Sequence, residues 1–360
     1  MSDNKLTRRQ LAGSVSSIIA PSSLAHGQQG AGPASSTAKM PVQMIDSGPR
    51  LAPADEVVLV RDFEDGAKLK LPGRVFSTIA GTDHRAFDLI TLRPRMMIST
   101  MDMDLSVELF GDKLFTPILI GPVSDQNRYH ADAELGTVRG ASAGKAAVVI
   151  SSRSSVPIEQ VAAAAKTPLW YQVWAEADAK TQIQRAVKAG VRAVVITLGT
   201  ATGATAPVQP DWAEIDGLRQ GLSLPVLVKG IMTPADARMA LQHGVQGIIV
   251  SSWGTASKNA PIMALAPIVD VVGGKVPVLV DGSFWLGTDI VKALAFGAQA
   301  VLISRPAMWA LAANGAEGVQ AMLELLQSEL ARAMGMMGNS KPNTLTRKAL
   351  KIHAPEMGSL

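Results

Sequence analysis

Residues 225–252 read PVLVKGIMTPADARMALQHGVQGIIVSS, and this stretch decides the fold. It begins with an apolar run, 225–229, that ends in a polar residue. Residues 234–243 follow a threonine, begin with a proline and place apolar side chains at three- and four-residue spacing, as a helix does. Gly244 is a helix-end signal, and a second apolar run follows at 247–252. The stretch therefore predicts a strand, a helix and the next strand.

The same unit recurs along most of the chain, about every 20–30 residues. Its apolar runs are continuous, which is typical of strands buried on both faces in a parallel sheet. No G-x-G-x-x-G follows the first run, so a dinucleotide-binding sheet is not favoured. Eight units favour a closed (β/α)8 TIM barrel. The predicted helices include 158–165, 180–189, 234–243 and 288–296. The predicted strands are 117–122, 147–151, 169–172, 193–197, 225–229, 247–252, 277–281 and 300–305.

Polar residues follow the predicted strands at the end where a barrel of this class holds its chemistry. Any one of them can be a simple turn former, but a lysine, an aspartate and an arginine at neighbouring strand ends favour a binding site. Lys229 has a structural alternative, an ion pair with Asp281. The strand-end residues are Ser124, Ser151, Gln172, Thr197, Lys229, Trp253, Asp281 and Arg305.

The composition limits the chemistry. The chain has 360 residues, 47% hydrophobic and 18% charged, which fits one large core with an extension. It contains no cysteine, which excludes disulfides, thiolate metal sites and cysteine nucleophiles. The five histidines show no metal-ligand spacing, so no metal site is predicted. A net charge of +4 without a basic stripe argues against nucleic-acid binding.

The first 25 residues are typical of an export signal. Arg8 and Arg9 form a twin-arginine start, a mildly apolar stretch follows over 11–24, and small residues surround Ala25. This stretch is too short and too rich in serine for a stable membrane span. The alternative is a tail that contains two arginines by chance. We expect export to the periplasm by the twin-arginine route, which carries folded proteins.

The remaining chain divides into two parts. Residues 26–53 are rich in Gly, Ala, Ser and Pro and predict a flexible linker. The barrel domain is expected to span 54–360. Its ligand is expected to be a small molecule, whose identity the sequence does not give.

These features resemble the FMN-dependent 2-hydroxy-acid oxidase and dehydrogenase family, which includes glycolate and lactate oxidases and mandelate dehydrogenase. The resemblance runs from about Val75 to His353. It implies a TIM barrel, FMN as the cofactor and, by analogy, a homo-oligomer. The matching motifs are LRPR at 92–95, Ser151-Ser152, VKGI at 228–231, Asp281-Gly282, Arg305-Pro306 and the final helix over 315–334.

The resemblance also implies which residues contact FMN. Lys229 would lie beside the flavin N1–C2=O edge and stabilise the negative charge of the reduced ring. Gln172 and Thr197 would hydrogen-bond the isoalloxazine, and Arg305 would offer a fork of donors to the phosphate. The full set of expected FMN contacts is Pro122, Val123, Ser124, Ser151, Gln172, Thr197, Lys229, Asp281, Gly282, Ser304 and Arg305.

The substrate side departs from the family. The family takes the substrate proton with a histidine and binds its carboxylate with an arginine, both in the motif Asn-His-Gly-Ala-Arg. Here 252–256 reads SWGTA, so Trp253 stands at the base position and Ala256 at the clamp position. An indole N–H can donate but cannot accept a proton. Two substrate tyrosines correspond to Thr78 and Trp174, which with Trp253 form the predicted substrate pocket.

Other family positions differ too. The aspartate that orients the histidine corresponds to Gly199, and 199–210 contains no arginine to match the family's lid arginine. A phosphate-binding arginine corresponds to Trp285, and the glycine before Arg305 is Ser304. The phosphate site is therefore expected to keep half of its contacts.

Three functions remain open. The first is an exported FMN-binding oxidoreductase-like barrel that does not oxidise ordinary 2-hydroxy acids, since neither the base nor the clamp is present. The second is a catalytically inactive barrel kept for binding or assembly, its old pocket filled by tryptophans. A relative of the FMN-dependent isopentenyl-diphosphate isomerases is a third alternative, disfavoured by the export signal.

Overall fold

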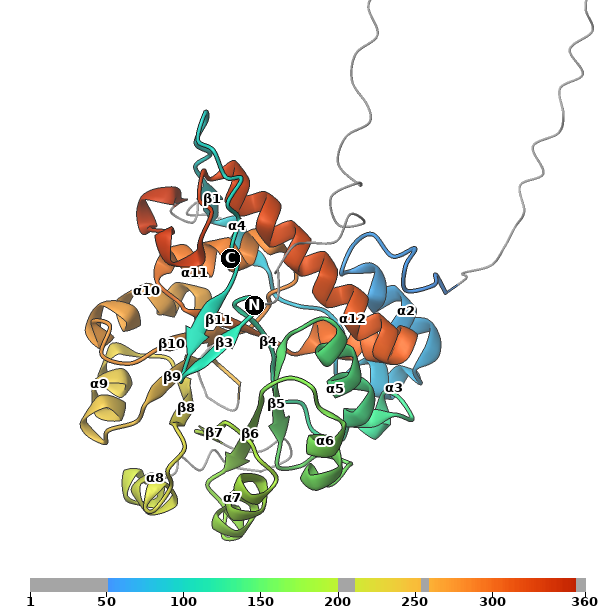
Figure 1. The fold of residues 1–360 in the computed structure, drawn as a ribbon, viewed down its shortest axis with the longest axis vertical. Coiled ribbons are helices and arrows are strands. Elements are labelled where there is room, and N and C mark those ends of the chain that lie inside the picture. Colours follow the sequence, from blue (N-terminus) through green and yellow to red (C-terminus); the bar gives the residue numbers. More distant parts are fainter. Residues whose placement is uncertain (1–50, 200–210, 254–258, 354–360) are drawn as a thin grey trace, which may run out of the picture. The chain divides into compact units, whose positions relative to one another are not determined.

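The computed structural model describes residues 51–199, 211–253 and 259–353. Eight parallel strands form a closed barrel (Figure 1). The barrel closes where the last strand pairs with the first, with Val301 beside Ile118. This confirms the predicted TIM barrel. The strands are β4 (Ile118–Ile120), β5 (Ala147–Ser151), β6 (Leu169–Trp174), β7 (Ala193–Thr197), β8 (Val226–Ile231), β9 (Gly247–Val250), β10 (Val278–Asp281) and β11 (Ala300–Ile303).

A helix follows each strand and covers the outside of the barrel. The Thr233 hydroxyl accepts the Asp236 N–H and caps its helix, as the Thr-Pro pair predicts. The last helix contains a break at Asn314 and Gly315, where Gly315 has a φ of +61°. The helices are α5 (Ala133–Ala143), α6 (Ile158–Ala164), α7 (Ala179–Lys188), α8 (Trp212–Arg219), α9 (Pro234–Gln242), α10 (Pro261–Val272), α11 (Gly287–Phe296) and α12 (Arg305–Met336).

Alternate residues of each strand face the helices and the barrel interior. The interior holds one buried apolar cluster, to which β6 contributes Trp170. A hairpin of β2 (Val107–Leu109) and β3 (Asp112–Leu114) closes the amino end, because its Leu109 and Leu114 belong to this cluster. The interior is therefore packed with apolar side chains at its amino end and centre.

Further elements precede and follow the barrel. They are α2 (Asp62–Lys70), α3 (Gly73–Phe76), α4 (Arg85–Asp88) and β1 (Ile90–Leu92), which pairs with β12 (Leu350–Ile352). Three short 3-10 turns are η1 (Gln126–Arg128), η2 (Pro342–Thr344) and η3 (Arg347–Ala349). None of the helices in the described ranges is both long and apolar enough to cross a membrane.

Several boundaries differ from the expected ones: β4, β9 and β11 end two residues early, β6 and β8 run two residues further, and Arg305 begins α12 and does not end a strand. Leu51 already packs against Gly66 of α2, so chain that we expected to be linker contacts the folded unit. Strand β8 runs past Lys229 to Ile231, with a bulge at Gly230, whose φ is +114°. A glycine tolerates this backbone, and the bulge lets the strand continue beyond the polar residue at which we expected it to end.

Candidate functional site

A layer of polar residues and glycine lies at the carboxyl end of the barrel. Each member stands two residues after an interior apolar residue on its own strand, so alternation turns it inward as well. Leu227 and Lys229 on β8 are one example. We call this set the polar layer; it consists of Gly121, Ser151, Gln172, Thr197, Lys229, Ser251, Asp281 and Ser304.

Hydrogen bonds connect one side of the polar layer. The Ser151 hydroxyl donates to Gln172 Oε1 at 3.1 Å and lies 3.2 Å from the Ser124 hydroxyl. Ser151 and Gln172 are each 2% exposed. The Gln172 Nε2 donor is buried and has no hydrogen-bond partner. Because buried donors are almost always satisfied, this amide is a natural contact for a ligand acceptor.

An ion pair occupies the opposite side. Lys229 Nζ lies 2.8 Å from Asp281 Oδ2, and the Lys229 side chain is only 3% exposed. Lys229 also donates to the Ser251 hydroxyl at 2.9 Å, and that hydroxyl donates to Asp281 at 3.3 Å. The structural alternative for Lys229, an ion pair with Asp281, is therefore present. This ion pair does not alter the direction of the Lys229 side chain, which points into the barrel.

The other expected flavin contacts lie along the same rim. Thr197 is 2% exposed and ends β7, directly beside Lys229 in the strand register. Pro122 and Val123 follow β4 and are half-buried, and the Val123 carbonyl accepts a hydrogen bond from Gln126. Backbone and side-chain groups from five neighbouring strands thus converge on one end of the barrel.

The expected phosphate contacts gather after the last two strands. Gly282 has a φ of +130°, which suits glycine and follows Asp281 directly. Ser304 lies so close to Gly121 that any side chain at position 121 would collide with the Ser304 hydroxyl. Arg305 begins α12, and its Nη1 donates to the Gly81 carbonyl at 2.5 Å. The Arg305 guanidinium is thus tied to the segment before the barrel.

The predicted substrate residues occupy different surroundings. Trp174 is 7% exposed and lies on the same face of β6 as Gln172, and its indole N–H is buried without a partner. Trp253 is 54% exposed, and its backbone N–H donates to Ser251. Thr78 is exposed, and its hydroxyl lies 3.2 Å from that of Tyr129. No hydrogen bond or ring contact joins these three in the described chain. Ala256 lies outside the described residues.

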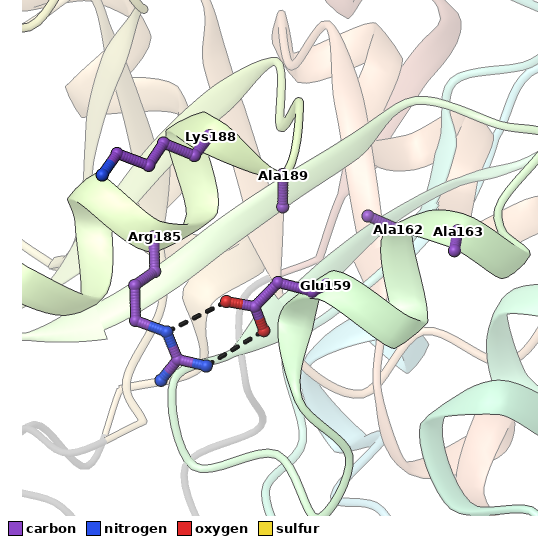
Figure 2. A pocket seen from close by; sticks show the side chains of 6 residues that line it. All are labelled: Glu159, Ala162, Ala163, Arg185, Lys188 and Ala189. Carbon is purple, nitrogen blue, oxygen red and sulfur yellow. Dashed lines mark hydrogen bonds and ion pairs between the residues drawn. The ribbon is translucent and has the colours of Figure 1, made fainter.

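A concave surface lies on the outside of the barrel, between α6 and α7 (Figure 2). It is an open depression of about 510 Å3, crossed by a two-point ion pair from Arg185 to Glu159 at 2.9 and 3.0 Å. Both side chains are at least half exposed, so the pair is well solvated. Its lining contains no strand-end residue, which separates it from the predicted site. The remaining lining residues are Ala162, Ala163, Lys188 and Ala189.

A (β/α)8 barrel with an inward polar layer at its carboxyl end defines a class of barrels that bind small ligands at the strand ends. Comparison with known proteins gives the family. The model of the FMN-dependent dehydrogenase family matches residues 77–207 and 201–352, and the chain belongs to that family.

Several relatives are similar over nearly their whole length. Glycolate oxidase 3 of Arabidopsis thaliana is 31% identical, covering 82% of this chain and 96% of the relative. The 4-hydroxymandelate oxidase of Amycolatopsis orientalis is 32% identical, covering 82% of this chain and 98% of the relative. A crystal structure of mandelate oxidase superposes with a TM-score of 0.77 at 31% identity, covering 83% of this chain and all of that one.

The cofactor of this family is FMN. The polar layer fits a flavin, because its buried Gln172 amide lacks an acceptor and the ring offers carbonyl oxygens. Lys229 supplies a buried positive charge on the opposite side of the layer, near Asp281. The expected flavin-side residues are therefore compatible with FMN in their types and positions.

The predicted residues do not include Ser251 and Tyr129, whose side chains contact residues of this site, or Gly121 of the polar layer. Ser251 bridges Lys229 and Asp281 and is 1% exposed, but it stands at the end of an apolar run and looks like a turn former. The sequence feature that could have indicated Ser251 is its position two residues after Ile249, a residue of the barrel interior. Tyr129 is 8% exposed and contacts Thr78 across a large sequence separation, for which the sequence carries no local signal.

Proposed function

We propose that this chain is an FMN-binding oxidoreductase-like barrel whose altered active site does not oxidise ordinary 2-hydroxy acids. The observation that carries the proposal is Trp253 at the end of β9, where the family resemblance puts the proton-abstracting histidine. Its indole has one N–H donor and no basic nitrogen. A side chain that cannot accept a proton cannot act as the general base.

The histidines of the described chain have other partners. His84 contacts Asp289 at 2.9 Å, and His243 contacts Asp216 at 2.7 Å. His130 accepts from the Asp132 N–H at 3.1 Å, and His353 lies 2.8 Å from the Thr91 hydroxyl. His84 and His243 flank helices α4 and α9, His130 lies between η1 and α5, and His353 follows β12, so all four stand outside the polar layer. These contacts support the proposal that no described histidine replaces the missing base.

The flavin side supports cofactor binding. Bound FMN would supply a hydride acceptor. Gln172 and Lys229 would orient and polarise the ring, with Asp281 and Ser251 holding the lysine in place. The differences from the family thus affect proton removal and substrate binding, while the groups expected against the ring remain.

Purification and spectroscopy test both halves of the proposal. The purified protein, or apo-protein reconstituted with FMN, is expected to be yellow and to show the flavin absorption bands. Anaerobic mixing with glycolate, lactate or mandelate is expected to leave those bands unbleached. A colourless protein that cannot be reconstituted would refute FMN binding, and rapid bleaching by any of the three acids would refute the altered chemistry.

A second function, a catalytically inactive binding barrel, is favoured by Trp174. This side chain is 7% exposed and fills space on the inward face of β6, two residues beyond Gln172. A bulky indole there is what a filled substrate pocket requires. If FMN binds tightly but no electron donor or acceptor exchanges electrons with it, the inactive barrel is the better account.

We also infer that the chain is exported by a twin-arginine signal in residues 1–25. Arg8 and Arg9 support this inference, which rests on the sequence alone because these residues lie outside the described ranges. Replacing both arginines by lysine should retain a reporter fusion in the cytoplasm of a bacterium that has this export route. Equal export of the two fusions would contradict the inference.

A further inference from the structure

Arg61 lies beside the residue that replaces the family's phosphate-binding arginine. It immediately precedes α2, and its guanidinium carbon stands 5.5 Å from the centre of the Trp285 ring. The Arg61 side chain is 66% exposed, so its donors face solvent at this edge. A guanidinium that lies over an indole ring is positioned by that ring, and the N–H groups along the edge of the guanidinium can still bind an oxyanion.

A short chain of contacts links Arg61 to Arg305. Arg305 donates to the Gly81 carbonyl, and the Gly81 N–H donates to Glu64 Oε1, both at 2.5 Å. The other Glu64 oxygen lies 3.9 Å from Arg61 Nε, which is a long ion pair. Arg305 and Glu64 thus both bond the backbone of Gly81, and Glu64 in turn lies near Arg61. Glu64 and Arg305 come from α2 and α12, which lie side by side in Figure 1.

His84 and Asp289, two charged groups that contact Trp285, are paired with each other. His84 packs its ring edge against Trp285 at 5.1 Å and bonds Asp289 at 2.9 Å. The fully buried Asp289 also accepts the Leu286 N–H at 3.1 Å. One oxygen of the Glu64 carboxylate accepts the Gly81 N–H, and the other forms only the long ion pair with Arg61. The ion pair of Arg61 with Glu64 is long, and Asp62 and Asp65 also stand in the first turn of α2, which follows Arg61.

We propose that Arg61 supplies the positive charge that Trp285 lacks, so that Arg61 and Arg305 together bind the FMN phosphate. The inference rests on the proposed function, since it requires FMN in this barrel. It replaces the expectation that half of the phosphate contacts are missing, because the second cation comes from the segment before the barrel and not from the loop after β10.

The phosphate carries most of a double negative charge at neutral pH, whereas riboflavin has the same ring and no phosphate. The ratio of the dissociation constants for riboflavin and FMN therefore isolates the phosphate contribution from the ring contribution. One charge-assisted hydrogen bond at a partly exposed position changes an affinity by about tenfold. Arg61→Ala is therefore expected to lower the ratio by about tenfold and to leave the riboflavin affinity unchanged.

The experiment measures quenching of flavin fluorescence on full-length apo-protein at fixed ionic strength. Arg61→Lys keeps the charge without the fork and is expected to weaken FMN binding less than Arg61→Ala. Arg185→Ala, which removes an exposed arginine from the outer depression, is the matched control and should bind both flavins like wild type. Raising the salt concentration should weaken FMN binding more in wild type than in Arg61→Ala, because exposed charges are screened.

The outcomes separate this inference from the function on which it rests. A wild-type protein that binds neither flavin refutes the proposed function. Wild-type binding of both flavins with equal affinity, or an unchanged ratio in Arg61→Ala, overturns the role of Arg61 alone. Equal weakening of riboflavin and FMN in Arg61→Ala would also overturn it, because that result means a structural effect on the ring site.

Discussion

Replacing Lys229 by methionine separates the two roles of this residue, the ion pair with Asp281 and the predicted flavin contact. The substitution keeps the length of the side chain and removes the charge. Lys229 is 3% exposed, and its ammonium lies 2.8 Å from Asp281 and 2.9 Å from Ser251. Removing one partner of a buried pair typically costs about 3–5 kcal/mol, and because Asp281 is still 13% exposed we expect about 3 kcal/mol.

Urea unfolding of the apo-protein measures this change in stability. Lys229→Met should lower the midpoint without changing the slope, since the surface exposed on unfolding stays the same. Adding Asp281→Asn should recover at least half of the difference, because no unpaired charge then remains. If Lys229 contacts the ring, both Lys229→Met and the double variant with Asp281→Asn should bind FMN more weakly than wild type. Lys188→Met, at an exposed position of α7, serves as the control.

Two results would refute the reasoning. A Lys229→Met protein within about 1 kcal/mol of wild type would show that the ion pair does not stabilise the barrel. FMN binding and a flavin spectrum unchanged by the substitution would show that Lys229 does not face the ring. The first outcome concerns the pair alone, and the second concerns the predicted cofactor site.

Three other perturbations test individual side chains of the site and its surroundings. Trp253→His combined with Ala256→Arg should raise the rate of anaerobic flavin bleaching by mandelate or glycolate about 100-fold or more. An unchanged rate would show that the missing base and clamp do not limit the oxidation of these acids. Trp174→Phe should keep or slightly raise the urea midpoint, because it removes an unpartnered buried donor; a destabilisation above about 2 kcal/mol would reveal a partner. Burial disfavours the His84 imidazolium, but the hydrogen bonds and charges of Asp289 and Asp88 together outweigh this and raise the pKa of His84 above 6.5. Its contribution to stability should therefore be complete below pH 6.5 and decline as pH rises through the raised pKa, and His84→Asn should lack that decline in urea unfolding.

The fold could be predicted because each βα unit carries its own local signal. Runs such as 147–151 and 193–197 match the observed strands residue for residue, and the helix that follows Thr233 begins where its cap predicts. Strand ends were less predictable. The bulge at Gly230 depends on the pairing of β8 with β9, a tertiary feature with no local signature.

The candidate site could be predicted only in part. The strand-end rule found Gln172, Lys229 and Asp281, whose side chains the barrel turns inward. It gave no indication of the contact between Arg61 and Trp285, which joins the start of α2 to the loop before α11. Such a long-range contact follows from how the segment before the barrel packs, and no spacing in the sequence reports it.

The arrangement of the site separates residues that folding constrains from residues that it constrains little. Lys229, Ser251 and Asp281 depend on one another, so replacing one of them leaves a buried polar group without its partner, at a cost of about 1–3 kcal/mol or more. Trp253 is 54% exposed, and substitutions at exposed positions usually change stability by less than about 0.5 kcal/mol. Residues at the rim can therefore be replaced at little structural cost. The ion pair of Lys229 with Asp281 stabilises the folded barrel, so its presence supports the fold more directly than it supports FMN binding. The Gln172 amide, which has no hydrogen-bond partner, is the stronger structural argument for a bound flavin.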